Sequence, residues 1–180
     1  QVQDLSVIMV LDESASLGED FEKVKQYASS FITNVLAEIP NARIGIVDFA
    51  DEIHTFPATN NKTALINYIA SLQQGPFTTL YESVNVGIDM LEDMDAEAKV
   101  LLVFTDGTDN NSDPEFTPTY ILDRLNNTTS DVKITSFTIG LEGKGGVDKP
   151  VLTEMAANGG SAAFPKNADE LGKVFLKFSS

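Results

Sequence analysis

The chain has 180 residues, of which 42% are hydrophobic and 22% charged, a length and composition that suit one globular domain with a full core. Acidic residues outnumber basic ones by 27 to 12, giving a formal net charge of −15, which excludes the basic surface that nucleic-acid binding needs. The chain has no cysteine, and no apolar run approaches the roughly 20 residues that span a bilayer, so we expect neither thiolate metal sites nor membrane insertion.

The first part of the chain alternates between apolar runs and helical spacing. Residues 5–11 form a nearly continuous apolar run with β-branched residues, which is typical of a strand buried on both faces. Apolar residues at three- and four-residue steps then predict a helix over 21–39, with acidic residues at its start and a proline just after its end. Residues 44–49 predict a second strand, and 53–56 a short third strand that ends at Pro57.

The same alternation continues to the end of the chain. The predicted segments are helices near 65–72 and 84–91, a strand over 100–104, a helix near 121–125, a strand over 134–139, a helix over 151–157, a short strand over 162–164 and a closing helix over 169–178. This order predicts a three-layer α/β/α fold around a doubly wound, mostly parallel sheet, with one antiparallel edge strand after the tight connection at Asp51. We expect a single domain over residues 1–180, excised from a longer protein because Gln1 leads almost at once into a strand.

Acidic residues follow two of the most apolar strands. Asp12 comes directly after the first strand, and Asp106 comes just after the strand over 100–104. In open parallel sheets, ligands bind beyond the carboxyl ends of the strands, where the strand order reverses. We expect these two strands to be central neighbours, which would bring Asp12 and Asp106 together at one edge of the sheet.

The segment Asp12-x-Ser14-x-Ser16 carries an acid and two hydroxyls at alternate positions. Alternate side chains of an extended segment point the same way, so all three can converge on one point, where Asp106 adds a second carboxylate. Oxygen ligands suit Mg²⁺ or Ca²⁺, whereas zinc favours cysteine, which the chain lacks, or histidine, of which it has one. Two carboxylates with neutral hydroxyls leave a divalent ion incompletely neutralised, so we expect it to accept a carboxylate from another molecule.

These motifs, together with Thr78 in Phe77-Thr-Thr-Leu-Tyr-Glu82 and Asp106 in Phe104-Thr-Asp-Gly107, resemble those of von Willebrand factor A domains. The resemblance covers nearly the whole chain and includes the order of the elements. It implies a Rossmann-like fold with a metal-ion-dependent adhesion site that holds Mg²⁺, Mn²⁺ or Ca²⁺. The metal ligands that the resemblance implies are Asp12, Ser14, Ser16, Thr78 and Asp106, with Thr79 as the alternative to Thr78.

The function expected from the resemblance is non-enzymatic. The domain would bind an acidic residue of a protein partner through the divalent cation, as a cell-adhesion module of a secreted or cell-surface protein with neighbouring domains. The alternative is an intracellular domain of the same family that acts as an assembly or regulatory subunit of an AAA-type ATPase. A metal-dependent hydrolase would need a positioned base or nucleophile beside the ion, and the hydroxyls here are better explained as ligands.

Other polar residues receive simpler interpretations. Ser14 and Ser16 could instead cap the following helix. We interpret Asp109 and Asp113 as solvated loop acids and His54 as an ordinary edge-strand residue, and we expect Glu13 to point away from the metal ligands. In integrin-type relatives, rearrangement at the metal is coupled to displacement of the C-terminal helix, which here corresponds to residues 169–178.

Overall fold

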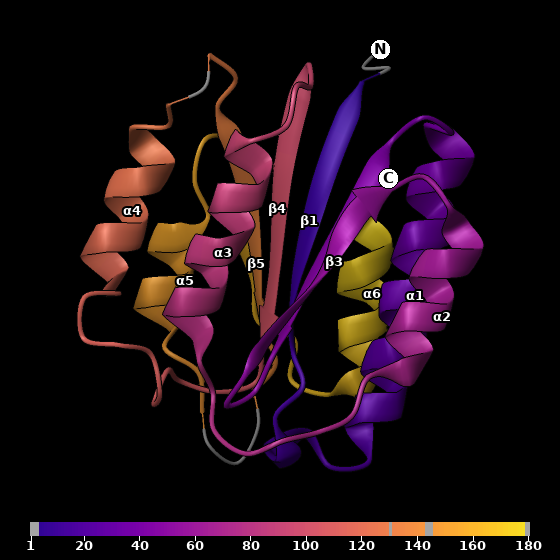
Figure 1. Ribbon diagram of the computed structural model, residues 1–180. Helices are drawn as coiled ribbons and strands as arrows, with labels where there is room; N and C mark the ends of the chain where they lie inside the picture. The colour runs from indigo at the N-terminus through magenta and orange to yellow at the C-terminus, as the bar shows by residue number, and fades with distance from the viewer. Residues whose placement is uncertain (1–3, 130, 143–145, 179–180) are drawn as a thin grey trace.

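A six-stranded sheet forms the centre of the fold, and helices cover both of its faces (Figure 1). The computed structural model describes residues 4–129, 131–142 and 146–178. The strand order is β3-β2-β1-β4-β5-β6, and every neighbouring pair is parallel except β2 and β3. The strands are β1 (Leu5–Asp12), β2 (Arg43–Phe49), β3 (Ile53–Thr59), β4 (Ala98–Thr105), β5 (Ile134–Gly140) and β6 (Ala162–Ala163). The predicted fold class is confirmed, including its single antiparallel edge strand.

The helices form two layers. Helices α1, α2 and α6 pack on one face of the sheet, and α3, α4 and α5 pack on the other (Figure 1). Within the described residues, no helix is long and apolar enough to cross a membrane. The helices are α1 (Asp20–Glu38), α2 (Lys62–Ser71), α3 (Leu80–Glu92), α4 (Pro118–Asn126), α5 (Lys149–Met155) and α6 (Ala168–Phe178), with a 3₁₀ turn over Ala15–Leu17.

The apolar character of β1 follows from its central place in the sheet. Alternate side chains of a strand face opposite sides, so Met9 and Leu11 enter the core under α1 while Ile8 and Val10 enter the core under α3. All four side chains are at most 2% exposed. The prediction of a strand buried on both faces is therefore confirmed, and β1 pairs with β4 as expected.

The edge strand β3 continues past Pro57, so the prediction that it ends there was wrong. The pairing of β2 with β3 shifts register between Ile44 and Ile46, whose partners are Thr59 and Phe56. The shift leaves Pro57 and Ala58 outside the regular ladder. A proline has no N–H to donate, and an irregularity on an edge strand is a position that tolerates it.

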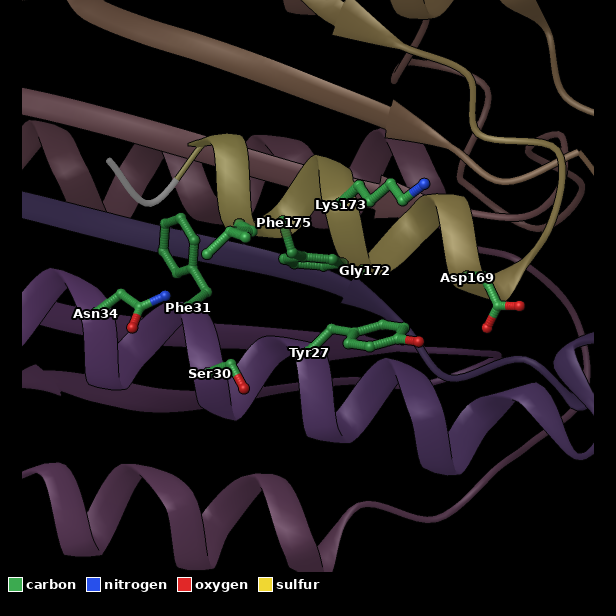
Figure 2. A pocket seen from close by; sticks show the side chains of 9 residues that line it. Tyr27, Ser30, Phe31, Asn34, Asp169, Gly172, Lys173 and Phe175 are labelled. Carbon is green, nitrogen blue, oxygen red and sulfur yellow. The ribbon is translucent and has the colours of Figure 1, made fainter.

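The C-terminal helix α6 packs against α1. The rings of Phe31 and Phe175 meet edge to face, with their centroids 6.4 Å apart. A pocket of about 340 Å³ lies between the two helices, and Figure 2 shows the Tyr27 ring at its side, facing Gly172. A Cβ atom at Gly172 would lie 2.7 Å from Cε1 of Tyr27, so the glycine permits this close approach of α6 to α1.

Candidate functional site

Asp12 joins the carboxyl ends of β1 and β4. Its Oδ1 accepts a hydrogen bond of 2.7 Å from the backbone N–H of Ser14. Its Oδ2 accepts one of 2.7 Å from the hydroxyl of Thr105 and one of 3.3 Å from the backbone N–H of Asp106. The side chain is completely buried. Asp12 and Asp106 therefore meet at one edge of the sheet, as predicted. They lie at the point where the strand order reverses, because β1 has β2 on one side and β4 on the other.

The two predicted serines converge on Asp106. Their hydroxyl oxygens are 2.9 Å apart, and each donates to Oδ1 of Asp106 over 3.1 Å. The Ser16 hydroxyl also lies 2.8 Å from Oδ2 of the same carboxylate. Ser14 precedes the 3₁₀ turn without capping it through its side chain, and the residue before α1 is Glu19. The serines therefore do not act as helix caps, which was the alternative interpretation.

The loop that carries the serines is held extended by neighbouring backbone. Glu13 donates its N–H to the carbonyl of Phe49 over 2.8 Å. Gly75 donates to the carbonyl of Glu13 over 3.0 Å and accepts from the N–H of Ala15 over 2.8 Å. This short parallel bridge keeps alternate side chains on the same side, which is the condition for Ser14 to face the site while Glu13 faces away from it.

Thr78 and Thr79 have different environments. The Thr79 hydroxyl donates to the carbonyl of Ala50 over 2.7 Å and accepts from the side-chain amide of Asn111 over 2.9 Å. The Thr78 hydroxyl has no such partner among the described residues, and it lies 3.7 Å from the position of a Cβ atom at Gly107. The arrangement therefore favours Thr78 over Thr79 as the threonine that faces the site.

A pocket of about 360 Å³ opens above these side chains. Four of the five predicted ligands line it. Asp12 lies behind them and accepts hydrogen bonds from the backbone N–H groups of Ser14 and Asp106. Phe77 is also part of the wall. The residue is 57% exposed, and its φ of 64° lies in the left-handed region, which costs a bulky residue about 1–2 kcal/mol. The lining residues are Ser14, Ala15, Ser16, Pro76, Phe77, Thr78, Asp106, Gly107, Thr108, Asp109 and Asn110.

The two carboxylates of the site are close together and lack a basic partner. Burial, and secondly the charge of Asp106, raise the pKa of Asp12 to about 7, although its hydrogen bonds from Ser14 and Thr105 act in the opposite direction. Neither Asp12 nor Asp106 forms a salt bridge within the described residues. Two buried acids beside hydroxyl oxygens form a donor set that fits a hard divalent cation.

The loop acid Asp109 caps α3 rather than being solvated, so its interpretation as a solvated acid was wrong. Its Oδ2 accepts the N–H of Tyr81 over 2.7 Å, and its Oδ1 accepts the N–H groups of Asn111 and Ser112. Asp113 is exposed, as expected. The sequence contains no local signal for this cap, because Asp109 and the start of α3 are separated by 28 residues along the chain.

A second cluster of ionisable side chains lies on the other side of the loop, and the sequence interpretation missed it. Glu13, Asp48 and His54 each place a ligand atom within 4.8 Å of the others. Glu13 points away from the predicted metal ligands, as expected, but it is buried, with 4% exposure. His54 lies on the edge strand β3, as expected, and pairs across the antiparallel ladder with Asp48. That cross-strand register is the only sequence signal that could have indicated the cluster.

Known proteins of one family are similar to this chain. The family model described as the von Willebrand factor type A domain matches residues 6–176. A search of curated protein sequences gave no match. Among solved structures, a von Willebrand factor type A protein from Catenulispora acidiphila is similar, with a TM-score of 0.82 and 15% identity over 99% of this chain and 42% of that chain.

Two further structures carry the same fold. Proximal thread matrix protein 1 from the mussel byssus, with a zinc-occupied MIDAS motif, has a TM-score of 0.77 and 17% identity over 99% of this chain and 45% of that chain. The pilus adhesin SpaC from Lactobacillus rhamnosus GG has a TM-score of 0.74 and 12% identity over 99% and 30%. The chain thus spans less than half of each of these three structures. With the family match over residues 6–176, the fold and the converging side chains lead to one conclusion: this chain belongs to the von Willebrand factor type A domain family.

Proposed function

We propose that the chain is a divalent-cation-dependent binding module that holds an acidic residue of a protein partner through the cation. The observation that carries the proposal is the convergence of Ser14, Ser16 and Asp106 on one pocket in front of the buried Asp12. In the described part of the chain, neither acid forms a salt bridge. Asp12, Ser14, Ser16, Thr78 and Asp106 would hold the ion, directly or through water. Mg²⁺ is the expected ion, with Mn²⁺ or Ca²⁺ as substitutes, because every donor is an oxygen.

The charge balance of the site favours an outside carboxylate as the remaining ligand. Two carboxylates and neutral hydroxyls neutralise a divalent ion less than a cage of carboxylates would. The cation would supply the positive charge that a partner's Asp or Glu needs, in a pocket that opens to solvent. Phe77 at the rim adds exposed aromatic surface, which is the type of side chain that anchors protein interfaces.

The partners of the hydroxyls support binding rather than catalysis. Both serine hydroxyls donate to Asp106, and His54 lies beside Glu13 and Asp48 on the other side of the loop. A serine nucleophile needs a base within hydrogen-bond reach, and an acid already engaged by two hydroxyls is better placed as a metal ligand. The similarity to a pilus adhesin supports an extracellular or cell-surface role within a longer protein.

Calorimetric titration with Mg²⁺, Mn²⁺ and Ca²⁺ tests the metal site. We expect Asp12→Ala and Asp106→Ala to weaken binding by more than the roughly 10–100-fold that loss of an outer-shell partner causes, while circular dichroism shows an intact fold. Asp113→Ala is the matched control, since it removes an exposed acid of the same loop and should leave affinity unchanged. Unchanged Mg²⁺ affinity in the folded Asp106→Ala protein would refute the site.

A peptide library tests the partner chemistry. Each peptide is made with an Asp and with an Asn at the same position, and binding is measured in Mg²⁺ and in EDTA. We expect the Asp versions alone to bind, and only with Mg²⁺ present. Equal binding of the Asn versions, or binding in EDTA, would exclude recognition of a carboxylate through the cation.

A further inference from the structure

Three side chains from separate elements converge behind the loop that carries the serines. Glu13 extends from the loop after β1, Asp48 lies near the end of β2, and His54 lies near the start of β3. His54 Nδ1 is 3.5 Å from Oδ2 of Asp48 and 3.8 Å from Oε2 of Glu13. The imidazole therefore faces both carboxylates with the same nitrogen. This cluster lies on the opposite side of the loop from Ser14 and Ser16, whose hydroxyls face Asp106.

The two carboxylates are buried without enough positive charge. The Glu13 side chain is 6% exposed and the Asp48 side chain 3% exposed, and neither pairs with a lysine or arginine in the described part of the chain. The Glu13 side chain shares a hydrogen bond with the side chain of Asp48, so the two acids are partners of each other. Two adjacent buried carboxyl groups without a full counter-charge are costly, and a bound cation would supply that charge.

Further acids lie near Glu13. The charges of Asp12 and Asp51 act on its side chain, in addition to that of Asp48. Negative charge is therefore concentrated around the cluster, and a bound cation would balance it.

The spacing of the three ligand atoms suits a small transition-metal ion. Zinc binds nitrogen and carboxylate oxygen at about 2.0–2.2 Å, so neighbouring ligand atoms of a tetrahedral site are about 3.3–3.5 Å apart. The distances from His54 Nδ1 to Asp48 and Glu13, 3.5 and 3.8 Å, need only a small closure to reach that spacing. An imidazole ligand favours zinc over Mg²⁺ or Ca²⁺, which prefer oxygen alone.

Neighbouring groups orient the cluster as they do in metal sites. The Tyr68 hydroxyl donates to Oδ1 of Asp48 over 2.5 Å, which leaves Oδ2 directed at His54. The carboxylate of Glu52 lies 4.0 Å from Nε2 of His54, on the side of the ring opposite the cluster. This distance is too long for a hydrogen bond, but a small movement of the exposed Glu52 side chain would let it accept the Nε2 proton, as outer carboxylates do for metal-bound histidines. A pocket of about 250 Å³ lined by all three side chains and Tyr68 gives an ion access from solvent.

We propose that Glu13, Asp48 and His54 form a second cation site, of zinc-binding type, with Glu13 Oε2, Asp48 Oδ2 and His54 Nδ1 as its ligands. The site is separate from the adhesion-type site and does not depend on it. It links the loop after β1 to the antiparallel edge of the sheet. Three protein ligands leave a fourth position open toward the pocket, for water or another donor.

Zinc titration by calorimetry, with Mg²⁺ present in excess, tests the proposal. Because a relative holds zinc in its MIDAS motif, the titration also uses Asp106→Ala, which removes the first site. We expect Asp106→Ala to bind one zinc ion, and adding His54→Gln to weaken that binding at least about tenfold. His54 is half-exposed, so its substitution should leave the fold intact. Asp51→Asn is the matched control, because it removes an exposed neighbouring charge without removing a ligand.

The single histidine of the chain gives a direct spectroscopic readout. Nitrogen-15 NMR of the imidazole ring should show zinc shifting the Nδ1 resonance of His54 while Nε2 keeps its proton. The proposal is overturned if the ring resonances do not respond to zinc, or if Asp106→Ala binds no zinc and all zinc binding belongs to the first site. Coordination through Nε2 would overturn it as well, because that nitrogen faces Glu52 rather than the buried carboxylates.

Discussion

At the scale of single residues, two adjacent threonines take opposite roles. Thr79 is 3% exposed, and its hydroxyl joins the start of α3 to the β2–β3 turn through Ala50 and to the loop after β4 through Asn111. Thr78 is held through its backbone, since its N–H donates to the side chain of Asn110 over 2.8 Å. Its hydroxyl remains for the pocket. One threonine therefore supports the site and the other faces it.

Substitution of each threonine by valine separates these roles. We expect Thr79→Val to lower the free energy of unfolding by about 1–3 kcal/mol, because buried partners lose a hydrogen bond. We expect Thr78→Val to have a smaller effect on stability but to weaken Mg²⁺ binding about tenfold or more. Urea denaturation and calorimetry measure the two effects. If Thr79→Val lost Mg²⁺ affinity and Thr78→Val did not, the ligand would be assigned to the wrong threonine.

At the scale of elements, two helices approach their neighbours closely at a glycine, and the two positions differ in how well they would accommodate a larger side chain. A Cβ atom at Gly87 in α3 would lie 2.9 Å from Cδ1 of Leu101 and 3.0 Å from Cγ2 of Val10, both of which are fixed in the sheet. The three atoms nearest to a Cβ atom at Gly172 in α6 would all belong to Tyr27, whose ring borders the pocket between α1 and α6 (Figure 2). The first contact is with packed core and the second with a side chain that has space to turn.

Alanine at the two glycines should therefore have different effects. Both substitutions gain up to about 1 kcal/mol of intrinsic helix stability. We expect Gly87→Ala to be destabilising overall by about 1–3 kcal/mol, because the core around Val10 and Leu101 is overpacked. We expect Gly172→Ala to be close to neutral. Thermal denaturation of both variants tests this, and an equal loss of stability would show that α6 is packed as rigidly as α3.

At the scale of the whole molecule, negative charge is concentrated where the sheet ends. Asp12, Asp106, Glu13 and Asp48 are all at most 5% exposed, within a chain whose formal net charge is −15. Burial raises the pKa of Asp12 to about 7 and that of Glu13 to about 9, so the folded protein holds protons that the unfolded chain releases at lower pH. The fold without bound cations is therefore stabilised by protons at this end.

The sign of the pH dependence follows from these values. A carboxyl with a raised pKa contributes stability below its unfolded value and loses that contribution as the pH rises through its folded value. We expect the metal-free protein to lose about 4 kcal/mol of unfolding free energy between pH 6 and pH 8, with the larger share from Glu13 because its folded pKa lies above this range. Saturating Mg²⁺ should reduce the loss, because the ion favours ionised Asp12.

Urea denaturation at each pH, with EDTA and with Mg²⁺, measures this dependence. Asp106→Asn serves as a comparison, since it removes the neighbouring charge that raises the pKa of Asp12 and should make the metal-free curve flatter. A metal-free protein that gained stability from pH 6 to pH 8 would contradict the raised pKa values. Glu92 does not affect this window, because its lowered pKa changes stability only at more acidic pH.

The sequence alone determined the order of strands and helices and the meeting of Asp12 and Asp106 at one edge of the sheet. The apolar run of β1 required burial on both faces, and the alternation of strands and helices required a parallel sheet with helices on both sides. Asp12 and Asp106 could be brought together because parallel neighbours end at the same edge. These inferences depend on local periodicity and on one topological rule.

Only the tertiary structure decided the features that depend on the register between distant segments. The continuation of β3 past Pro57 depends on where β2 shifts against it. The choice of Thr78 over Thr79 depends on Ala50 and Asn111. The cluster of Glu13, Asp48 and His54 depends on three elements meeting at the same level of the sheet edge. These contacts join side chains from segments that are distant in the sequence. Their distances depend on how the whole fold packs, which no local sequence pattern reveals.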